Sequence, residues 1–241
     1  MDKWYEVPGK AGTNVIYSRV RLVRNLKEYP FPGRLTKEQS AELSEKLLGG
    51  LTGIASMDRM QYRFTHLERM GDLEKTALLE RRAINRSVMK KKDPTGMILS
   101  EDESTAILLN GDDHVRIQTL QTGLTLEQLY ERADKIDDYI SERFDYAFDE
   151  KYGYLTSFPT NVGTGLRAAV VLHLPMLSKN KNFNSLVADM GRFGTQVRGV
   201  YGEGAENFGS LYQISNQKTL GQTEREIIDI VRKAALELRS E

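Results

Sequence analysis

The chain has 241 residues, with 34 basic and 34 acidic side chains, and it contains no cysteine. Disulfides and thiolate metal sites are therefore excluded, and the zero net charge argues against nucleic acid as a partner. Apolar runs are too short for a signal peptide or a membrane span, so we expect one cytoplasmic domain over residues 1–241 without a membrane partner.

Strand and helix patterns follow one another along the chain. In chain order they predict a strand at 15–22, helices at 37–48 and 73–84, strands at 97–100, 105–109 and 115–119, a helix at 126–147, a strand at 168–174, a helix at 185–192, strands at 196–201 and 210–215, and a helix at 223–238. Capping boxes at Thr36, Thr125 and Thr223 open three of the helices, and Gly49 and Gly50 are expected to end the first. A sheet with helices over one face predicts an α+β fold, mainly antiparallel.

Four motifs point to phosphate chemistry: SRVRLVRN at 18–25, NGDDHVR at 110–116, TNVGTGLR at 160–167 and GEGAENFGSLYQISNQ at 202–217. Glycines let the backbone approach a ligand closely, and the planar fork of an arginine matches phosphate oxygens. The pattern GxxxxGK[ST] is absent, so arginines are expected to bind the phosphates in its place. The candidates lie in or beside predicted strands: Arg19 and Arg21, which share one face of their strand, and Arg116, Arg167 and Arg198. For any one of them alone, a surface or salt-bridged role is the alternative.

Two carboxylates could grip and deprotonate a guanidinium acceptor. A guanidinium stays protonated at neutral pH, and its nitrogen attacks phosphorus only after charge is withdrawn. Asp112 and Glu203 form the natural pair, because each lies close to a candidate phosphate-binding arginine. The alternative for Asp112 and Asp113 is a solvated turn, since Asn-Gly-Asp-Asp is also favourable turn chemistry.

On these motifs the sequence resembles the phosphagen (guanidino) kinases, and most closely their bacterial branch, the protein arginine kinases. SRVRLVRN is similar to the N-terminal element of the family, and TNVGTGLRAAV and RGVYGEGAENFGSLYQISNQKTLG are similar to its nucleotide-loop and flexible-loop signatures. The resemblance runs from about residue 14 to residue 240. It implies an antiparallel sheet flanked by helices, like the catalytic domain of glutamine synthetase, and ATP as donor with Mg²⁺ held by the ATP phosphates.

The resemblance also implies roles for single residues. Asp112 would be the general base and Glu203 would bind the guanidinium. Arg82 stands where relatives often place a histidine near the adenine and could stack on the base, although a solvent-facing role is the alternative. The phosphate-binding set would be Ser18, Arg19, Arg21, Arg116, Arg167 and Arg198.

Three departures from the family pattern bear on activity. Gly111 and Asp112 stand where the family has two glutamates, so the base is one methylene shorter, and a reach error of about 1 Å can reduce a rate by roughly a hundredfold. Phe158 replaces a common cysteine beside the substrate. The resemblance stops near the C-terminus of the sequence, so we expect this chain, truncated or naturally short, to lack the C-terminal phosphoarginine-binding domain of the bacterial branch. Only about 13 residues precede the resemblance, too few for the N-terminal helical domain of metabolic phosphagen kinases, so we expect the acceptor side to be open to a protein.

The leading hypothesis is therefore a protein arginine kinase whose partners are proteins bearing arginine. The resemblance adds an activator or adaptor protein and a homodimer as further candidate partners. One alternative is an inactive pseudokinase that binds nucleotide or protein as a regulator, and another is a kinase of a small free guanidine.

Overall fold

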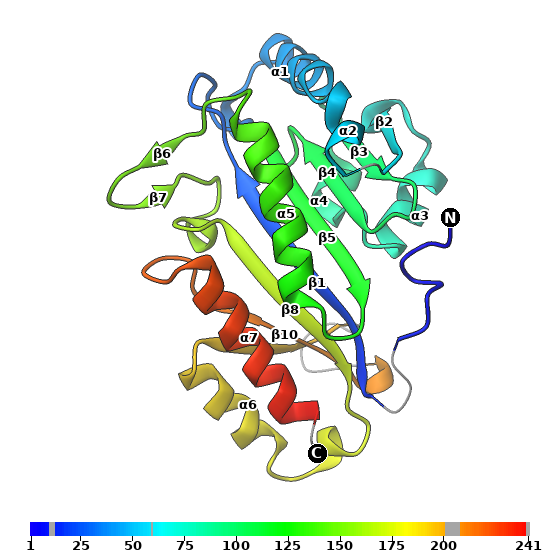
Figure 1. The fold of residues 1–241 in the computed structure, drawn as a ribbon, viewed down its shortest axis with the longest axis vertical. Coiled ribbons are helices and arrows are strands. Elements are labelled where there is room, and N and C mark those ends of the chain that lie inside the picture. The colour runs from blue at the N-terminus through cyan, green and yellow to red at the C-terminus, as the bar shows by residue number, and fades with distance from the viewer. Residues whose placement is uncertain (10–12, 59, 201–207, 240–241) are drawn as a thin grey trace.

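The computed structural model describes residues 1–9, 13–58, 60–200 and 208–239. The strands are β1 (Val15–Arg24), β2 (Tyr62–His66), β3 (Gly96–Ser100), β4 (Thr105–Leu109), β5 (Val115–Thr122), β6 (Phe148–Asp149), β7 (Gly153–Tyr154), β8 (Leu166–His173), β9 (Thr195–Gly199) and β10 (Leu211–Asn216). Eight of them form one sheet in the order β2-β3-β4-β5-β1-β8-β10-β9, with neighbouring strands antiparallel (Figure 1). The predicted α+β class with a mainly antiparallel sheet is confirmed.

The helices cover both faces of this sheet, but unequally. They are α1 (Lys37–Gly50), α2 (Ala55–Asp58), α3 (Asp72–Glu80), α4 (Arg86–Lys90), α5 (Leu126–Ser141), α6 (Phe183–Arg192) and α7 (Glu224–Arg239). The main core joins α1, α5, α6 and α7 to one face, and Figure 1 shows α5 and α7 crossing that face. On the other face, Leu78 of α3 and Val88 of α4 pack against Met97, Leu99 and Leu108 of β3 and β4. The expectation that helices cover only one face was wrong here, because β3 and β4 are apolar on both sides.

Helix α1 begins as predicted and ends later. Thr36 Oγ1 accepts a hydrogen bond from Gln39 N at 3.2 Å, and Gln39 Oε1 accepts one from Thr36 N at 3.0 Å. The helix then continues through Gly49 to Gly50 instead of stopping before them. A Cβ at Gly50 would lie 2.4 Å from Cζ of Phe144, so this glycine allows the close approach of an aromatic ring. Packing, and not helix termination, accounts for its presence.

Two other helices end earlier than their sequence patterns predict. Helix α3 stops at Glu80, because Arg82 has a left-handed backbone with φ of 67°. Helix α5 stops at Ser141, although the apolar periodicity continues to residue 147.

The capping box predicted at Thr125 is wrong, since the Thr125 side chain makes no capping hydrogen bond. By contrast, Thr223 and Glu226 form the box predicted before α7.

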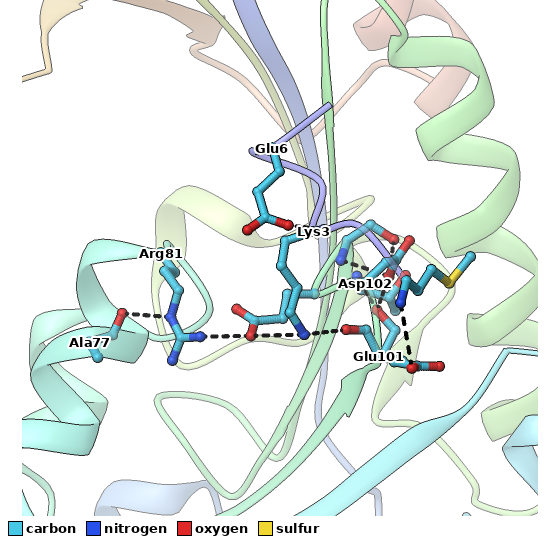
Figure 2. A network of polar contacts seen from close by, with 11 residues as sticks. Lys3, Glu6, Ala77, Arg81, Glu101 and Asp102 are labelled. Atoms are coloured by element: carbon cyan, nitrogen blue, oxygen red, sulfur yellow. Dashed lines mark hydrogen bonds and ion pairs between the residues drawn. The ribbon is translucent and has the colours of Figure 1, made fainter. Parts of the chain in front are cut away.

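The N-terminal segment is tied to the turn between β3 and β4 and to the end of α3 (Figure 2). Lys3 Nζ donates to the carbonyl of Glu101 at 2.6 Å, and it lies 3.6 Å from Oε1 of the buried Glu103. Arg81 donates to the same Glu103 oxygen at 2.7 Å and to the carbonyl of Ala77 at 3.1 Å. The network therefore fixes the end of α3 directly before Arg82.

Candidate active site

Five of the predicted arginines project from the same face of the sheet. On β1 and β8, Val20, Leu22 and Ala168 point into the helix-covered core, so the alternate residues point to the opposite face. Arg21 and Arg167 are direct partners across the β1–β8 pair. A cavity of about 570 Å³ on this face is lined by Arg21, Arg116, Arg167 and Arg198. An adjoining hollow of about 630 Å³ is lined by Arg19, Arg21, Arg82 and Arg116. The fold thus brings together six arginines from five separate segments of the sequence.

Arg19, Arg21 and Arg116 have no carboxylate partner among the described residues. Burial lowers the pKa of Arg21 well below its ordinary value, and the neighbouring Arg19, Arg116 and Arg167 lower it further. Burial also lowers the pKa of Arg116 to about 10, although Asp112 opposes that shift. Within the described part of the chain, the Nε atoms of Arg19, Arg21 and Arg116 are buried without a hydrogen-bond acceptor. Unpaired buried donors carrying positive charge are unfavourable alone and favour an anion in the cavity.

Neutral groups hold the side chains of Arg19 and Arg167 in place. One terminal nitrogen of Arg19 donates to Gln213 Oε1 at 2.7 Å, and one of Arg167 donates to the carbonyl of Asn216 at 2.8 Å. These partners fix the side chains without neutralising their charge. Arg167 is half-buried and Arg198 is exposed, so the cavity is more open toward β9 than toward β1.

Ser18 lies elsewhere, which contradicts its predicted role in binding phosphate. It is fully buried on the face of β1 that packs against α5. Because it is one position away from Arg19, the two side chains lie on opposite faces. Its hydroxyl donates to the carbonyl of Gly123 at 2.7 Å and accepts from Thr125 N at 3.1 Å. Ser18 thus accepts from the backbone N of Thr125, a group that in a capping box would bond the side chain of the third helical residue.

Arg82 lines the second hollow from the end of α3. Its carbonyl accepts a hydrogen bond from Gln118 Nε2 of β5 at 2.6 Å, which holds this turn against the sheet. Its charge contributes to lowering the pKa of Arg19, so the two guanidinium groups are close. Contact between Arg82 and an adenine stays a prediction.

The loop between β4 and β5 presents Asp112 to the cavity. Asn110 has φ of 54° and its N donates to the carbonyl of His114 at 2.7 Å, which closes the turn. Asp113 is not the solvated turn residue of the alternative reading, because it is 2 % exposed. Its Oδ1 accepts from Asn25 Nδ2 and from Ser157 N, both at 2.7 Å. Asp113 therefore anchors the loop, a role that sequence reasoning missed.

His114 is a second anchor of this loop. Its Nδ1 accepts from Leu26 N at 2.9 Å, and Nε2 lies 3.0 Å from the carbonyl of Pro30. These two partners require the neutral ring with the proton on Nε2. Burial lowers the pKa of His114 to about 4, although the bond to Pro30 opposes that shift.

We expect this histidine to make folding stability acid-sensitive. Because the folded pKa is lowered from 6.5 to about 4, the unfolded chain binds a proton between these pH values and the folded chain does not. The contribution of His114 to the free energy of unfolding is thus complete above pH 6.5 and is lost as the pH falls. The loss reaches roughly 3 kcal/mol at pH 4. Urea unfolding from pH 7 to pH 4 measures it, with His114→Gln as reference. Equal pH slopes for both proteins would contradict the assignment.

The loop before β8 depends on its glycines, which the structure places against other parts of the chain; close approach of a ligand to them stays a prediction. Gly163 has φ of 110°, and a Cβ there would lie 2.2 Å from the carbonyl oxygen of Thr219. Gly165 has φ of 65°, and a Cβ there would lie 2.6 Å from a terminal nitrogen of Arg24. Phe158, on the segment before this loop, lines the cavity and is 51 % exposed. Glu203, the second predicted carboxylate, lies outside the described residues.

Neither a metal cage nor a membrane span is found in the described ranges. No group of three or more histidine, aspartate or glutamate side chains there could hold a metal ion. No helix among residues 1–9, 13–58, 60–200 and 208–239 is long and apolar enough to cross a bilayer.

Comparison with known proteins assigns the family. Residues 45–240 match the family described as ATP:guanido phosphotransferase, C-terminal catalytic domain. The chain belongs to the ATP:guanido phosphotransferases. The predicted resemblance is therefore confirmed at the level of the family, and the arginine-lined cavity is a feature of a guanido phosphotransferase domain.

Two curated relatives named protein-arginine kinase are similar to this guanido phosphotransferase over most of its length. The protein from Halothermothrix orenii is 39 % identical over 228 residues, which are 95 % of this chain and 64 % of the relative. The protein from Caldanaerobacter subterraneus subsp. tengcongensis is 40 % identical over 226 residues, which are 94 % of this chain and 67 % of the relative. The chain thus spans about two thirds of the length of these relatives.

Solved structures show the same fold in other guanidino kinases. The substrate-free duplicated taurocyamine kinase from Schistosoma mansoni aligns with a TM-score of 0.80 at 27 % identity, over 93 % of this chain and 32 % of that one. A lombricine kinase aligns with a TM-score of 0.81 at 24 % identity, over 93 % of this chain and 65 % of that one, which speaks for the fold alone.

Proposed function

We propose that this chain transfers the γ-phosphoryl group of ATP to the guanidinium of an arginine side chain on another protein. The observation that carries the proposal is the cluster of Arg21, Arg116 and Arg167 in one cavity with Asp112. The name protein-arginine kinase, borne by the curated relatives, supports a protein arginine as the acceptor.

In this proposal the arginines bind the triphosphate. Arg21, Arg116 and Arg167 hold the β- and γ-phosphates, and Arg198 contacts them from the open edge at β9. The adjoining hollow, with Arg19 and Arg82 among its lining residues, takes the nucleoside. Each guanidinium offers paired donors to phosphate oxygens, and a partly buried cavity strengthens those contacts relative to water. The positive charges are already in place before the transition state forms, so little reorganisation accompanies the reaction.

Asp112 acts as the general base, and Glu203 is proposed as the second carboxylate around the acceptor. Asp112 accepts a proton from the guanidinium nitrogen as that nitrogen forms a bond to the γ-phosphorus. The bond between the γ-phosphorus and the β–γ bridging oxygen breaks at the same time, and ADP leaves with its electron pair. Positioning and charge stabilisation supply most of the catalysis in such a transfer.

The lining of this cavity fits a magnesium ion that is held by the phosphates of the nucleotide. Among the described lining residues, Asp112 and Asp113 are the only carboxylates, Asp113 is committed to loop hydrogen bonds, and the remaining charged groups are arginines. Such a set suits an ion that keeps several waters and binds phosphate oxygens, as Mg²⁺ does. When bound with ATP, Mg²⁺ neutralises charge on the β- and γ-oxygens.

The test is formation of acid-labile phosphoarginine on a loosely folded protein substrate with MgATP. We expect the wild-type chain to form it and Asp112→Asn to form it at least about a hundredfold more slowly, with nucleotide affinity retained. Nucleotide binding without phosphoarginine would exclude the kinase and leave the regulatory pseudokinase. Strong competition by free arginine would instead indicate a kinase of small guanidines.

An activator or adaptor protein and a second copy of the chain are further candidate partners. A pull-down would detect the activator or adaptor, and light scattering would detect the homodimer.

A further inference from the structure

Both oxygens of the Asp112 carboxylate are held by side chains at the start of α4. Asn85 Nδ2 donates to Asp112 Oδ2 at 2.7 Å, and Ser87 Oγ donates to Asp112 Oδ1 at 2.7 Å. A carboxylate with one bonded oxygen can still rotate about its last torsion, whose energy wells are broad. Two donors on different oxygens fix the plane of the group.

The donors are themselves fixed by the helix. Asn85 is the N-cap of α4, and its Oδ1 accepts from Val88 N at 3.0 Å. This bond determines which end of the amide faces Asp112, because the oxygen is already used and the nitrogen must point to the carboxylate. Ser87 Oγ also lies 3.0 Å from Asn85 Oδ1, but its single proton favours the shorter contact to the charged Asp112.

The backbone beside Asp112 is held by the same segment. Lys91, directly after α4, donates from Nζ to the carbonyls of Asn110 and Gly111 at 2.6 and 3.0 Å. A Cβ at Gly111 would lie 3.2 Å from a methyl group of Val88, so the glycine allows α4 to approach the loop closely. Helix α4 and Lys91 thus constrain both the side chain of Asp112 and the peptide groups before it.

This arrangement leaves Asp112 available to an acceptor. A carboxylate has about four lone-pair positions, and Asn85 and Ser87 occupy two of them. Asp112 also lines the cavity with Arg116, whose pKa its charge raises. A freely rotating Asp112 could form an ion pair with Arg116 and so remove a cation from the phosphate site. Holding the carboxylate by neutral donors keeps the acid and the cation apart.

From these contacts we propose that Asn85 and Ser87 are positioning residues that orient the Asp112 carboxylate toward the acceptor guanidinium. The proposal rests on the proposed function of Asp112 as the base. It assigns a role to α4, a helix of five residues that carries none of the predicted site residues.

The experiment compares Asn85→Ser, Ser87→Ala and the double variant with the wild-type chain in the phosphoarginine assay. Serine at position 85 keeps a good N-cap but is too short to reach Asp112. We expect kcat to fall about tenfold in each single variant and about a hundredfold in the double variant, with KM for ATP within about twofold of wild type. Ser87→Thr keeps the hydroxyl and is expected to restore most of the rate. Lys90→Ala, in the same helix, is the matched control and is expected to behave as wild type.

The outcomes separate this proposal from the proposed function. Wild-type activity with an unchanged kcat in the folded double variant would overturn the positioning role and leave the kinase intact. Equal losses in Ser87→Ala, Ser87→Thr and Lys90→Ala would also overturn it, because they would reflect damage to α4 itself. A wild-type chain that forms no phosphoarginine would overturn both.

Discussion

Arg21→Met is expected to lose about a thousandfold in phosphoryl transfer while the folded protein becomes more stable. Arg21 is the cation with the most cationic neighbours in the cavity, since Arg19, Arg116 and Arg167 all lower its pKa. Removing one preorganised donor from a site of developing charge reduces kcat by about 10² to 10³. Arg21 is partly buried and has no carboxylate partner among the described residues, so removing its charge relieves repulsion. Apolar replacement of buried ionic groups often stabilises by about 1 kcal/mol or more. For a chain of this length, about 1 kcal/mol corresponds to a rise in Tm of roughly 2–4 °C.

The measurements are kcat in the phosphoarginine assay and Tm by differential scanning calorimetry. Arg63→Met is a matched control, because Arg63 is an exposed arginine on the edge strand β2 and does not line the cavity. We expect that variant to change neither quantity appreciably. Retained activity in Arg21→Met, or a fall in its Tm, would mean that Arg21 supports the fold and does not bind the triphosphate.

Arg24→Met is expected to destabilise the folded chain by about 3–5 kcal/mol, the opposite effect from a substitution only three residues away. Arg24 is 1 % exposed and donates to Asp137 Oδ2 from Nη2 at 2.7 Å and from Nε at 3.0 Å. Its Nη1 donates to the carbonyls of Val23 and Thr164, and its guanidinium lies 3.6 Å from the ring centroid of Tyr154. Loss of Arg24 leaves the buried carboxylate of Asp137 without its cation and releases the loop before β8.

Denaturant unfolding of Arg24→Met, with Asp137→Leu and the double variant, tests this expectation. Replacing both charges by apolar groups removes the uncompensated carboxylate, so the double variant is expected to be more stable than Arg24→Met. Destabilisations that simply add would contradict a direct pair. A change below about 1 kcal/mol in Arg24→Met would show that the ion pair is dispensable for folding.

Most of the secondary structure could be predicted because each element has a local signal. The strands of the sheet follow apolar or alternating runs, and the Thr36 and Thr223 capping boxes are formed as their spacing predicts. Errors occurred where a distant contact decided the outcome. Gly50 stays helical because it packs under Phe144, and the backbone N of Thr125 bonds the distant Ser18 instead of the side chain of the third helical residue. β2, α2, α4 and the β6–β7 hairpin were not predicted, since each element has five residues or fewer and no clear periodicity.

The candidate site was predicted in part. The sequence selected the arginines of the cavity, since motif spacing and resemblance both point to them, and it selected Asp112. It could not separate Ser18 from Arg19, although the two residues lie on opposite faces of β1. It also missed the anchoring roles of Asp113 and His114, because their partners are distant in the sequence. Asn25 lies 88 residues from Asp113, and Pro30 lies 84 residues from His114.

The amino-acid sequence by itself determined the family, the fold class and the type of chemistry, because these depend on residue types at fixed local spacings. Only the tertiary structure decided which arginines act together. Arg21 and Arg24 belong to one motif, but an offset of three residues in a strand places them on opposite faces. One faces a cavity of like charges, and the other is buried against Asp137. The partners that distinguish them come from β5, β8 and α5, and the chain brings these elements together only when it folds.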